Sequence, residues 1–247
     1  MNLNLTKISA LALLLGSGSA IAGSMGAVAT EPAYNFFIGG TAGIGMLQGQ
    51  YSSENPSNAD THYARIGNNT FLGGGLFGIQ TVRANDLYLA LVGNALYNSQ
   101  NATERSSTVI VAGAAVANHI ATVKNDFQYG ANVRLGKKLG IATPYVLGGV
   151  EAGSWEMVLG NNNTVSNRGI APGSHNGYSK TLVGPQAGVG VSLALNDNWS
   201  AGMEYAHTWF GNVNVTLVDS VTNFSWNHQT KVQQDQVLFS LNYAFNA

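Results

Sequence analysis

The sequence predicts an all-β fold: an eight-stranded antiparallel up-and-down β-barrel that crosses a membrane. Three observations predict this class. Eight segments alternate apolar and polar residues, which places successive side chains on opposite faces of a strand. The connections between these segments alternate between short turns and long polar stretches. Charged residues make up only 9% of the 247 residues, whereas ordinary soluble domains contain about 25%.

The N-terminal residues predict an export signal. Lys7 supplies a basic end, residues 8–15 form an apolar core, and Ala20 and Ala22 fit a small-residue cleavage site. We therefore expect a signal peptide over residues 1–22, cleaved after Ala22, a short periplasmic segment over 23–33, and a barrel over 34–247. The apolar stretch at 109–120 is too short for a membrane-spanning helix.

The eight expected strands follow the alternation in chain order. They cover residues 34–47, 71–82, 87–97, 124–135, 144–159, 178–195, 199–210 and 232–245. Most are as long as the roughly 9–11 residues that a tilted strand needs to cross a bilayer. The first strand shows little polarity on either face, with Ile38 and Met46 on one side and Phe37 and Gly43 on the other.

Strands two and three, four and five, and six and seven are joined by turn-type segments rich in Gly, Asn and Asp. These segments are residues 83–86, 136–143 and 196–198. The other four connections, 48–70, 98–123, 160–177 and 211–231, are long and polar, so we expect four long loops on one side and both chain ends on the other. A meander of this kind removes its sheet edges by closing on itself. Residues 109–123 fit either an extension of the neighbouring strands or a short helix.

The fourth and sixth strands indicate which face meets lipid. One face of each is made of small and amide residues, and the opposite face is a run of Val, Ala, Leu and aromatic residues. Asp126, Gln128 and Arg134 belong to the polar face of strand four, and Gln186 to that of strand six. Small polar residues suit a crowded interior, so the apolar faces point to lipid. Aromatic residues near strand ends fit interfacial girdles: Tyr34, Tyr97, Trp199, Trp209, Tyr243 and Phe245.

Two carboxylates inside strands, Glu151 and Glu204, predict a polar network in the lumen. A carboxylate facing lipid is costly, so both should point inward with Gln128, Gln186 and Arg134. Arg134 lies several residues from the expected level of Glu151, which makes a direct pair between them doubtful. We expect a hydrogen-bonded plug; the alternative is a narrow passage with an acidic lining that prefers cations.

Other motifs support no chemistry. Gly73, Gly75 and Gly78 have the spacing of a dinucleotide-binding loop, but more strand follows where a helix is required. The five histidines are expected on loops and one strand end, without metal-ligand spacing. The absence of Cys excludes disulfides and thiol catalysis, and the net charge of −1 argues against a nucleic-acid partner. We expect no cofactor and no enzymatic activity.

The leader, the GSMG segment after it, the eight strands with their turns and loops, and the LNYAF stretch at 241–245 resemble the small outer-membrane β-barrels of Gram-negative bacteria. The similar groups are the OmpA transmembrane-domain-like, OmpX-like and opacity-protein-like families. The resemblance implies an outer-membrane location and an assembly signal at Leu241, Tyr243 and Phe245. It also implies a monomer in contact with outer-membrane lipid and with the outer-membrane assembly machinery.

The function expected on these grounds is structural and surface-interactive, with the four long loops contacting an unknown extracellular or host ligand. The alternative is a narrow pore or small-molecule transporter similar to the OmpW group. A lipid-modifying enzyme is a weaker third hypothesis, because neither His207 nor His175 stands in a His-x-Ser arrangement.

Overall fold

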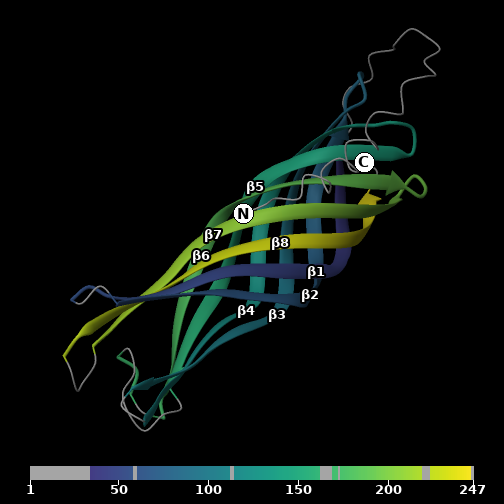
Figure 1. Ribbon diagram of the computed structural model, residues 1–247. Helices are drawn as coiled ribbons and strands as arrows, with labels where there is room; N and C mark the ends of the chain where they lie inside the picture. Colours follow the sequence, from purple (N-terminus) through teal and green to yellow (C-terminus); the bar gives the residue numbers. More distant parts are fainter. Residues whose placement is uncertain are drawn as a thin grey trace, which may run out of the picture.

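A closed ring of eight antiparallel strands forms the molecule (Figure 1). The computed structural model describes residues 34–57, 60–111, 114–161, 169–171, 173–218 and 223–245, so the expected signal peptide and the segment 23–33 lie outside the described residues. The strands are β1 (Tyr34–Asn55), β2 (Asp60–Val82), β3 (Leu87–Val111), β4 (Ala114–Lys137), β5 (Ala142–Asn161), β6 (His175–Ala194), β7 (Trp199–Val218) and β8 (Ser225–Phe245). Each strand pairs with its chain neighbour, and β8 pairs with β1, so the predicted fold class is confirmed. In the described part of the chain, no helix has the length and apolarity to span a membrane.

The two ends of the barrel differ in their connections. At one end, which we call the turn end, β2–β3, β4–β5 and β6–β7 are joined by the predicted short turns. At the other end, the hairpin end, most of the expected loops are strand. The β1–β2 pairing runs to Asn55 and Asp60, and the β3–β4 pairing runs to Val111 and Ala114.

The expectation of long loops over 48–70, 98–123 and 211–231 is therefore wrong. Cross-strand hydrogen bonds continue past the apolar part of each strand, where the outward residues become polar and the alternation in hydropathy fades. Residues 109–111 and 114–123 extend β3 and β4, which decides between the two alternatives for this stretch.

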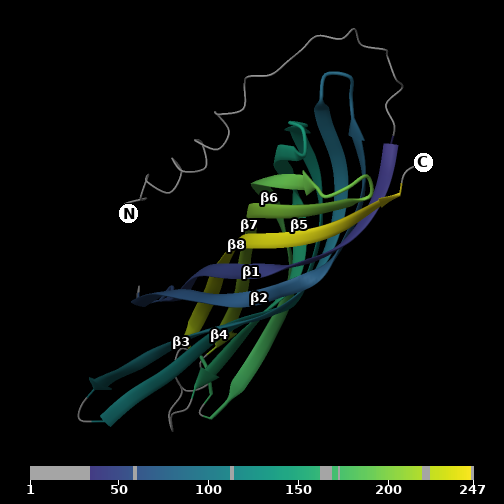
Figure 2. The same ribbon diagram turned by 90° about the vertical axis from the view of Figure 1, so that its right-hand side faces the viewer.

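The ring divides into two sheets near the hairpin end. Pairing between β2 and β3 stops at Leu72 and Asn98, and pairing between β6 and β7 stops at Gln186 and Thr208, although all four strands continue. Beyond this level, β7–β8–β1–β2 and β3–β4–β5–β6 form separate sheets. Figure 2 shows the β1–β2 and β3–β4 hairpins diverging there. We call this part the two-sheet extension.

Register shifts interrupt three strand pairs close to the same level. They lie between Tyr97 and Gln100 on β3, between Asn125 and Gln128 on β4, and between Trp209 and Gly211 on β7. A bulge inserts an extra residue into one strand, so that the side chains on its two sides no longer follow one continuous alternation between the faces. Asp126, expected on the inward face, is consequently exposed, and that expectation is wrong.

The outer surface between the two ends is apolar. Exposed hydrophobic side chains include Ile38 and Ile44 on β1, Val133 on β4 and Phe239 on β8. Trp199 near the turn end and Trp209, ten residues further along β7, are both about two-fifths exposed, at 41% and 43%. This spacing matches the roughly 9–11 residues with which a tilted strand crosses a bilayer.

Candidate functional site

The lumen holds a layer of amide side chains halfway along the barrel. Gln100, Gln128, Gln234 and Gln236, which we call the glutamine layer, come from β3, β4 and β8 and are at most 1% exposed. Gln128 donates to the Oε1 of Gln234 at 2.7 Å, and Gln234 donates to the Oε1 of Gln100 at 3.0 Å. Gln236 donates to the Oε1 of Gln128 at 3.0 Å. Three strands are thereby joined across the interior.

Glu151 lies next to this layer and is surrounded by neutral donors. Its carboxylate accepts hydrogen bonds from Gln186 Nε2, from Thr208 Oγ1 at 3.1 Å and from Gln236 Nε2 at 3.2 Å. The side chain is 1% exposed. Such bonds satisfy the oxygens of a buried carboxylate without a basic partner.

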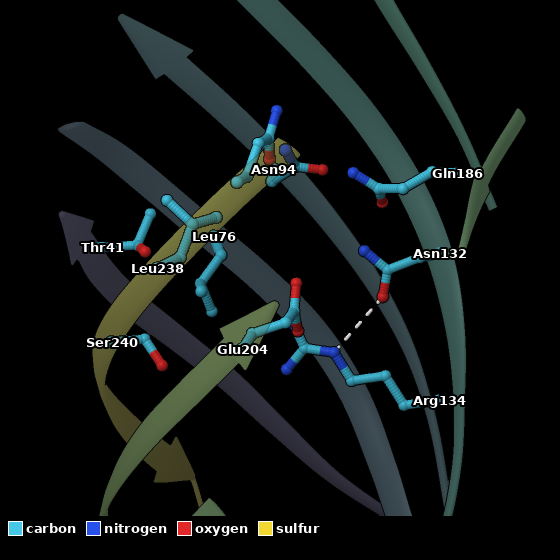
Figure 3. A pocket seen from close by; sticks show the side chains of 10 residues that line it. Thr41, Leu76, Asn94, Asn132, Arg134, Gln186, Glu204, Leu238 and Ser240 are labelled. Carbon is cyan, nitrogen blue, oxygen red and sulfur yellow. Dashed lines mark hydrogen bonds and ion pairs between the residues drawn. The ribbon is translucent and has the colours of Figure 1, made fainter. Parts of the chain in front are cut away.

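The second inward carboxylate, Glu204, has a basic partner. Arg134 Nη2 lies 2.8 Å from Glu204 Oε2, and the Tyr145 hydroxyl donates to the same oxygen at 3.0 Å. Arg134 Nε also donates to Asn132 Oδ1 at 3.2 Å, the bond drawn in Figure 3. The guanidinium carbon stands 5.0 Å from the centroid of the Tyr145 ring. The structure thus brings Arg134 to Glu204, and Glu151 to Gln186 and the glutamine layer, which includes Gln128.

Two small cavities lie between these groups and the turn end. The first, of about 20 Å³, is lined by Arg134, Glu204, Gln186 and Gln236 among others (Figure 3). The second, of about 10 Å³, reaches Phe37, Gln80 and Asn242. Arg134 and Ser240 line both, so the cavities adjoin one another along the lumen. Spaces of this size hold single water molecules and no larger solute.

An apolar cluster fills the lumen on the hairpin side of the glutamine layer. Trp155, Met157 and Leu159 of β5 are fully buried there, and the Trp155 and Phe210 ring centroids are 5.0 Å apart. Both sheets of the two-sheet extension contribute to it, for example through Tyr51 of β1. This cluster, which we call the apolar seal, separates the polar lumen from the hairpin end.

Asp235 is a charged residue that the sequence reasoning missed. On β8, Gln234 and Gln236 point inward, so Asp235 shares the outward face of Val237 and Phe239. Its carboxylate accepts hydrogen bonds from the Tyr205 hydroxyl at 2.6 Å and from Gln48 Nε2, and it lies 2.7 Å from His207 Nδ1. The period-two pattern of β8 could have identified this carboxylate, because it alternates with two glutamines.

His62, His119, His175 and His228, expected on loops, lie in strands, which corrects that expectation, and His207 lies in β7, within the strand expected for it. Within the part of the chain that the structure describes, no three His, Cys, Asp or Glu side chains come close enough to hold a metal ion. The described lumen side chains interact through hydrogen bonds and through the buried Arg134–Glu204 ion pair.

Leu241, Tyr243 and Phe245 share the outward face of β8 at the turn end. Leu241 and Phe245 are about half exposed, and the Tyr243 ring lies 5.2 Å from that of Trp199 and 5.1 Å from that of Phe245. The Tyr243 and Phe245 rings form part of the aromatic girdle at this end, and Leu241 belongs to the apolar surface beside it.

A family model described as outer membrane protein beta-barrel domain matches residues 9–245 of the chain. Among solved structures, OprG from Pseudomonas aeruginosa is similar over 87% of this chain and 98% of its own, with 10% identity and a TM-score of 0.54. Neisserial surface protein A is similar over 85% and 97%, with 15% identity and a TM-score of 0.40. Ail of Yersinia pestis is similar over 83% and 99%, with 11% identity and a TM-score of 0.33. No curated protein sequence matches the chain significantly.

Proposed function

The chain belongs to the outer membrane protein beta-barrel family, and from this premise we propose that it is a non-conducting surface protein whose two-sheet extension contacts an extracellular partner. Its location is the outer membrane. Short turns of such barrels face the periplasm and the longer connections face outward, so the hairpin end is the extracellular end. The protein acts as a monomer in this proposal.

The observation that carries the proposal is the filled lumen. The Arg134–Glu204 pair, the glutamine layer and the apolar seal follow one another from the periplasmic side to the extracellular side. Among the described residues, Trp155, Met157 and Leu159 of the apolar seal are fully buried, which supports a lumen closed to ions. A barrel of eight strands has an interior that side chains can fill, in contrast to the wide porins.

We therefore assign partner binding to the two-sheet extension, which projects beyond the membrane. The β1–β2, β3–β4 and β7–β8 hairpins remain paired up to their tips, so each presents a defined surface. Their outward positions include polar residues, as in Asn214 and Gln229. A paired hairpin loses little conformational entropy when it binds, which favours recognition.

The competing function, a narrow pore or transporter, rests on the two cavities near the periplasmic end. They would have to join an extracellular opening through the glutamine layer and the apolar seal. Because this needs the rearrangement of many buried side chains, we favour the surface role. Catalysis is not part of the proposal.

The surface role is tested by the adhesion of bacteria that display variants with a shortened hairpin. Residues 53–62 or residues 216–227 are replaced by Asn-Gly, which shortens one hairpin and keeps Tyr51 and Val213 of the apolar seal. We expect at least one variant to lose most of its adhesion to epithelial monolayers, relative to bacteria with the intact protein. A gel-mobility shift on heating serves as the control for folding. Unchanged adhesion in both variants would contradict the proposal. An absence of adhesion by bacteria that display the intact protein would contradict it as well.

A further inference from the structure

The outward side chains of β2, β1, β8 and β7 form rows that change in chemistry toward the extracellular end. The last apolar row contains Phe71, Ile44, Val237 and Tyr205. Two residues further along each strand, the row contains Asn69, Met46, Asp235 and His207. Beyond a row that includes Gln48 and Gln233, the fourth row contains Arg65, Gln50, Lys231 and Asn212. Apolar, polar and basic levels therefore follow one another on one continuous wall.

Six of these residues make an exterior polar patch: Gln48, Gln50, Arg65, His207, Lys231 and Asp235. The Asp235 carboxylate is held by Tyr205, His207 and Gln48, which come from the strands on both sides of β8. These contacts offset the charge of Asp235, which is only 7% exposed, so the exposed side chains of Gln48 and Gln50 form a polar shelf directly above the apolar wall.

Arg65 and Lys231 are the basic members of the patch. Both are exposed, and both stand opposite Gln50, from β2 and from β8. Neither belongs to an ion pair among the described residues. Two strand spacings place their backbones about 10 Å apart, and four residues of β8 place Lys231 about 13 Å beyond Asp235. Two unpaired cations at this separation can approach one anionic group from both sides.

We propose that the exterior polar patch binds the head group of an outer-leaflet lipid that carries both phosphate and hydroxyl or amide groups. The wall below the patch is covered by acyl chains, so whatever lipid touches Ile44 and Val237 presents its head group to the patch. The order of groups in such a lipid matches the order of the rows. Acyl chains meet the apolar row, hydroxyl and amide groups meet Gln48 and Gln50, and phosphate meets Arg65 and Lys231.

The site is independent of the proposed surface role, because it lies at the membrane level and the hairpin tips lie beyond it. The specificity is also distinct from a general attraction for anions. The polar shelf supplies hydrogen-bond acceptors that a sugar hydroxyl or amide can use and that a simple phosphate ester cannot.

The test uses the full protein in detergent and a bisphosphorylated disaccharide glycolipid, lipid A, as the probe. The double variant Arg65→Gln/Lys231→Gln removes both cations and keeps side-chain length. Lys137→Gln/Lys138→Gln removes two exposed cations at the periplasmic end and is the matched control. Dissociation constants come from native mass spectrometry or from the lipid-induced rise in Tm.

We expect the Arg65/Lys231 variant to bind lipid A at least tenfold more weakly than the intact protein, and the Lys137/Lys138 variant to bind it equally well. High salt should weaken binding to the intact protein, because exposed charges are screened. Phosphatidylcholine and inorganic phosphate should bind far more weakly than lipid A. Equal weakening in the two variants, no weakening in either, or an equal response to inorganic phosphate would overturn the proposal.

Discussion

Individual charged residues illustrate how the lumen accommodates buried ions. Glu204 is neutralised by Arg134 and bonded by Tyr145, whereas Glu151 relies on Gln186, Thr208 and Gln236. A buried ion pair adds little net stability compared with apolar residues, yet loss of one member is costly because it leaves an uncompensated charge.

We therefore predict that Glu204→Ala lowers the free energy of unfolding by about 3–5 kcal/mol, because Arg134 loses its partner inside the barrel. The double variant Arg134→Met/Glu204→Leu removes both charges and should be close to the intact protein or more stable. Urea unfolding in lipid vesicles measures both. If the single and double variants were destabilised equally, the ion pair would not be the reason.

For individual residues, the sequence predicts the strand face on which a side chain lies better than it predicts which side chains contact one another. Period-two alternation predicts inward faces for Gln128, Arg134, Glu151 and Gln186, and the four side chains are buried in the structure. Which side chains meet depends on strand register and on position around the ring, and neither is encoded in the spacing along one strand. Asp126 was predicted on the wrong face because a bulge interrupts the alternation of β4, and the partners of Asp235 could not be predicted because they come from two neighbouring strands.

The strands as elements show why one end of the barrel was predictable and the other was not. Short segments rich in Gly, Asn and Asp mark the turn end, and the observed turns of four residues each lie at these segments. On the extracellular side the apolar alternation fades where lipid gives way to water. The backbone pairing continues beyond that level, so hydropathy alone ends each strand too early.

Close approach of β1 and β8 at the closure of the barrel makes a specific glycine necessary. A Cβ added to Gly43 would lie 1.9 Å from the carbonyl oxygen of Val237, whereas a Cβ added to Gly40 meets no atom within 4 Å. We predict that Gly43→Ala costs about 1–3 kcal/mol of unfolding free energy and that Gly40→Ala changes it by less than about 0.5 kcal/mol. Similar values for the two variants in urea titrations would refute the close approach.

The outward aromatic residues of β8 allow assembly and stability to be separated. Phe245 is the backbone partner of Phe36 on β1, and both rings are exposed, at 53% and 61%. If Phe245 is part of an assembly signal, Phe245→Ala should reduce the amount of folded protein in the outer membrane several-fold more than Phe36→Ala. The heat-shifted gel band measures that amount in each strain. Equal losses would assign Phe245 to the girdle alone.

The whole molecule combines a lipid-facing wall, a filled lumen and a two-sheet extension above the membrane. The class of this architecture was predictable, because a closed barrel is the fold that satisfies period-two strands, low charge and alternating connections together. The apolar seal was not, since its residues come from all eight strands and meet only after closure.

Current across a planar bilayer tests the central claim, a lumen closed to ions, most directly. Purified protein, shown to be folded by its gel shift, is inserted at high copy number, and current is recorded in 1 M KCl at both polarities. We expect no current steps above the background of protein-free bilayers. Reproducible unitary steps from folded protein, lost on substitution of a lumen residue such as Glu151→Leu, would contradict it and favour the pore.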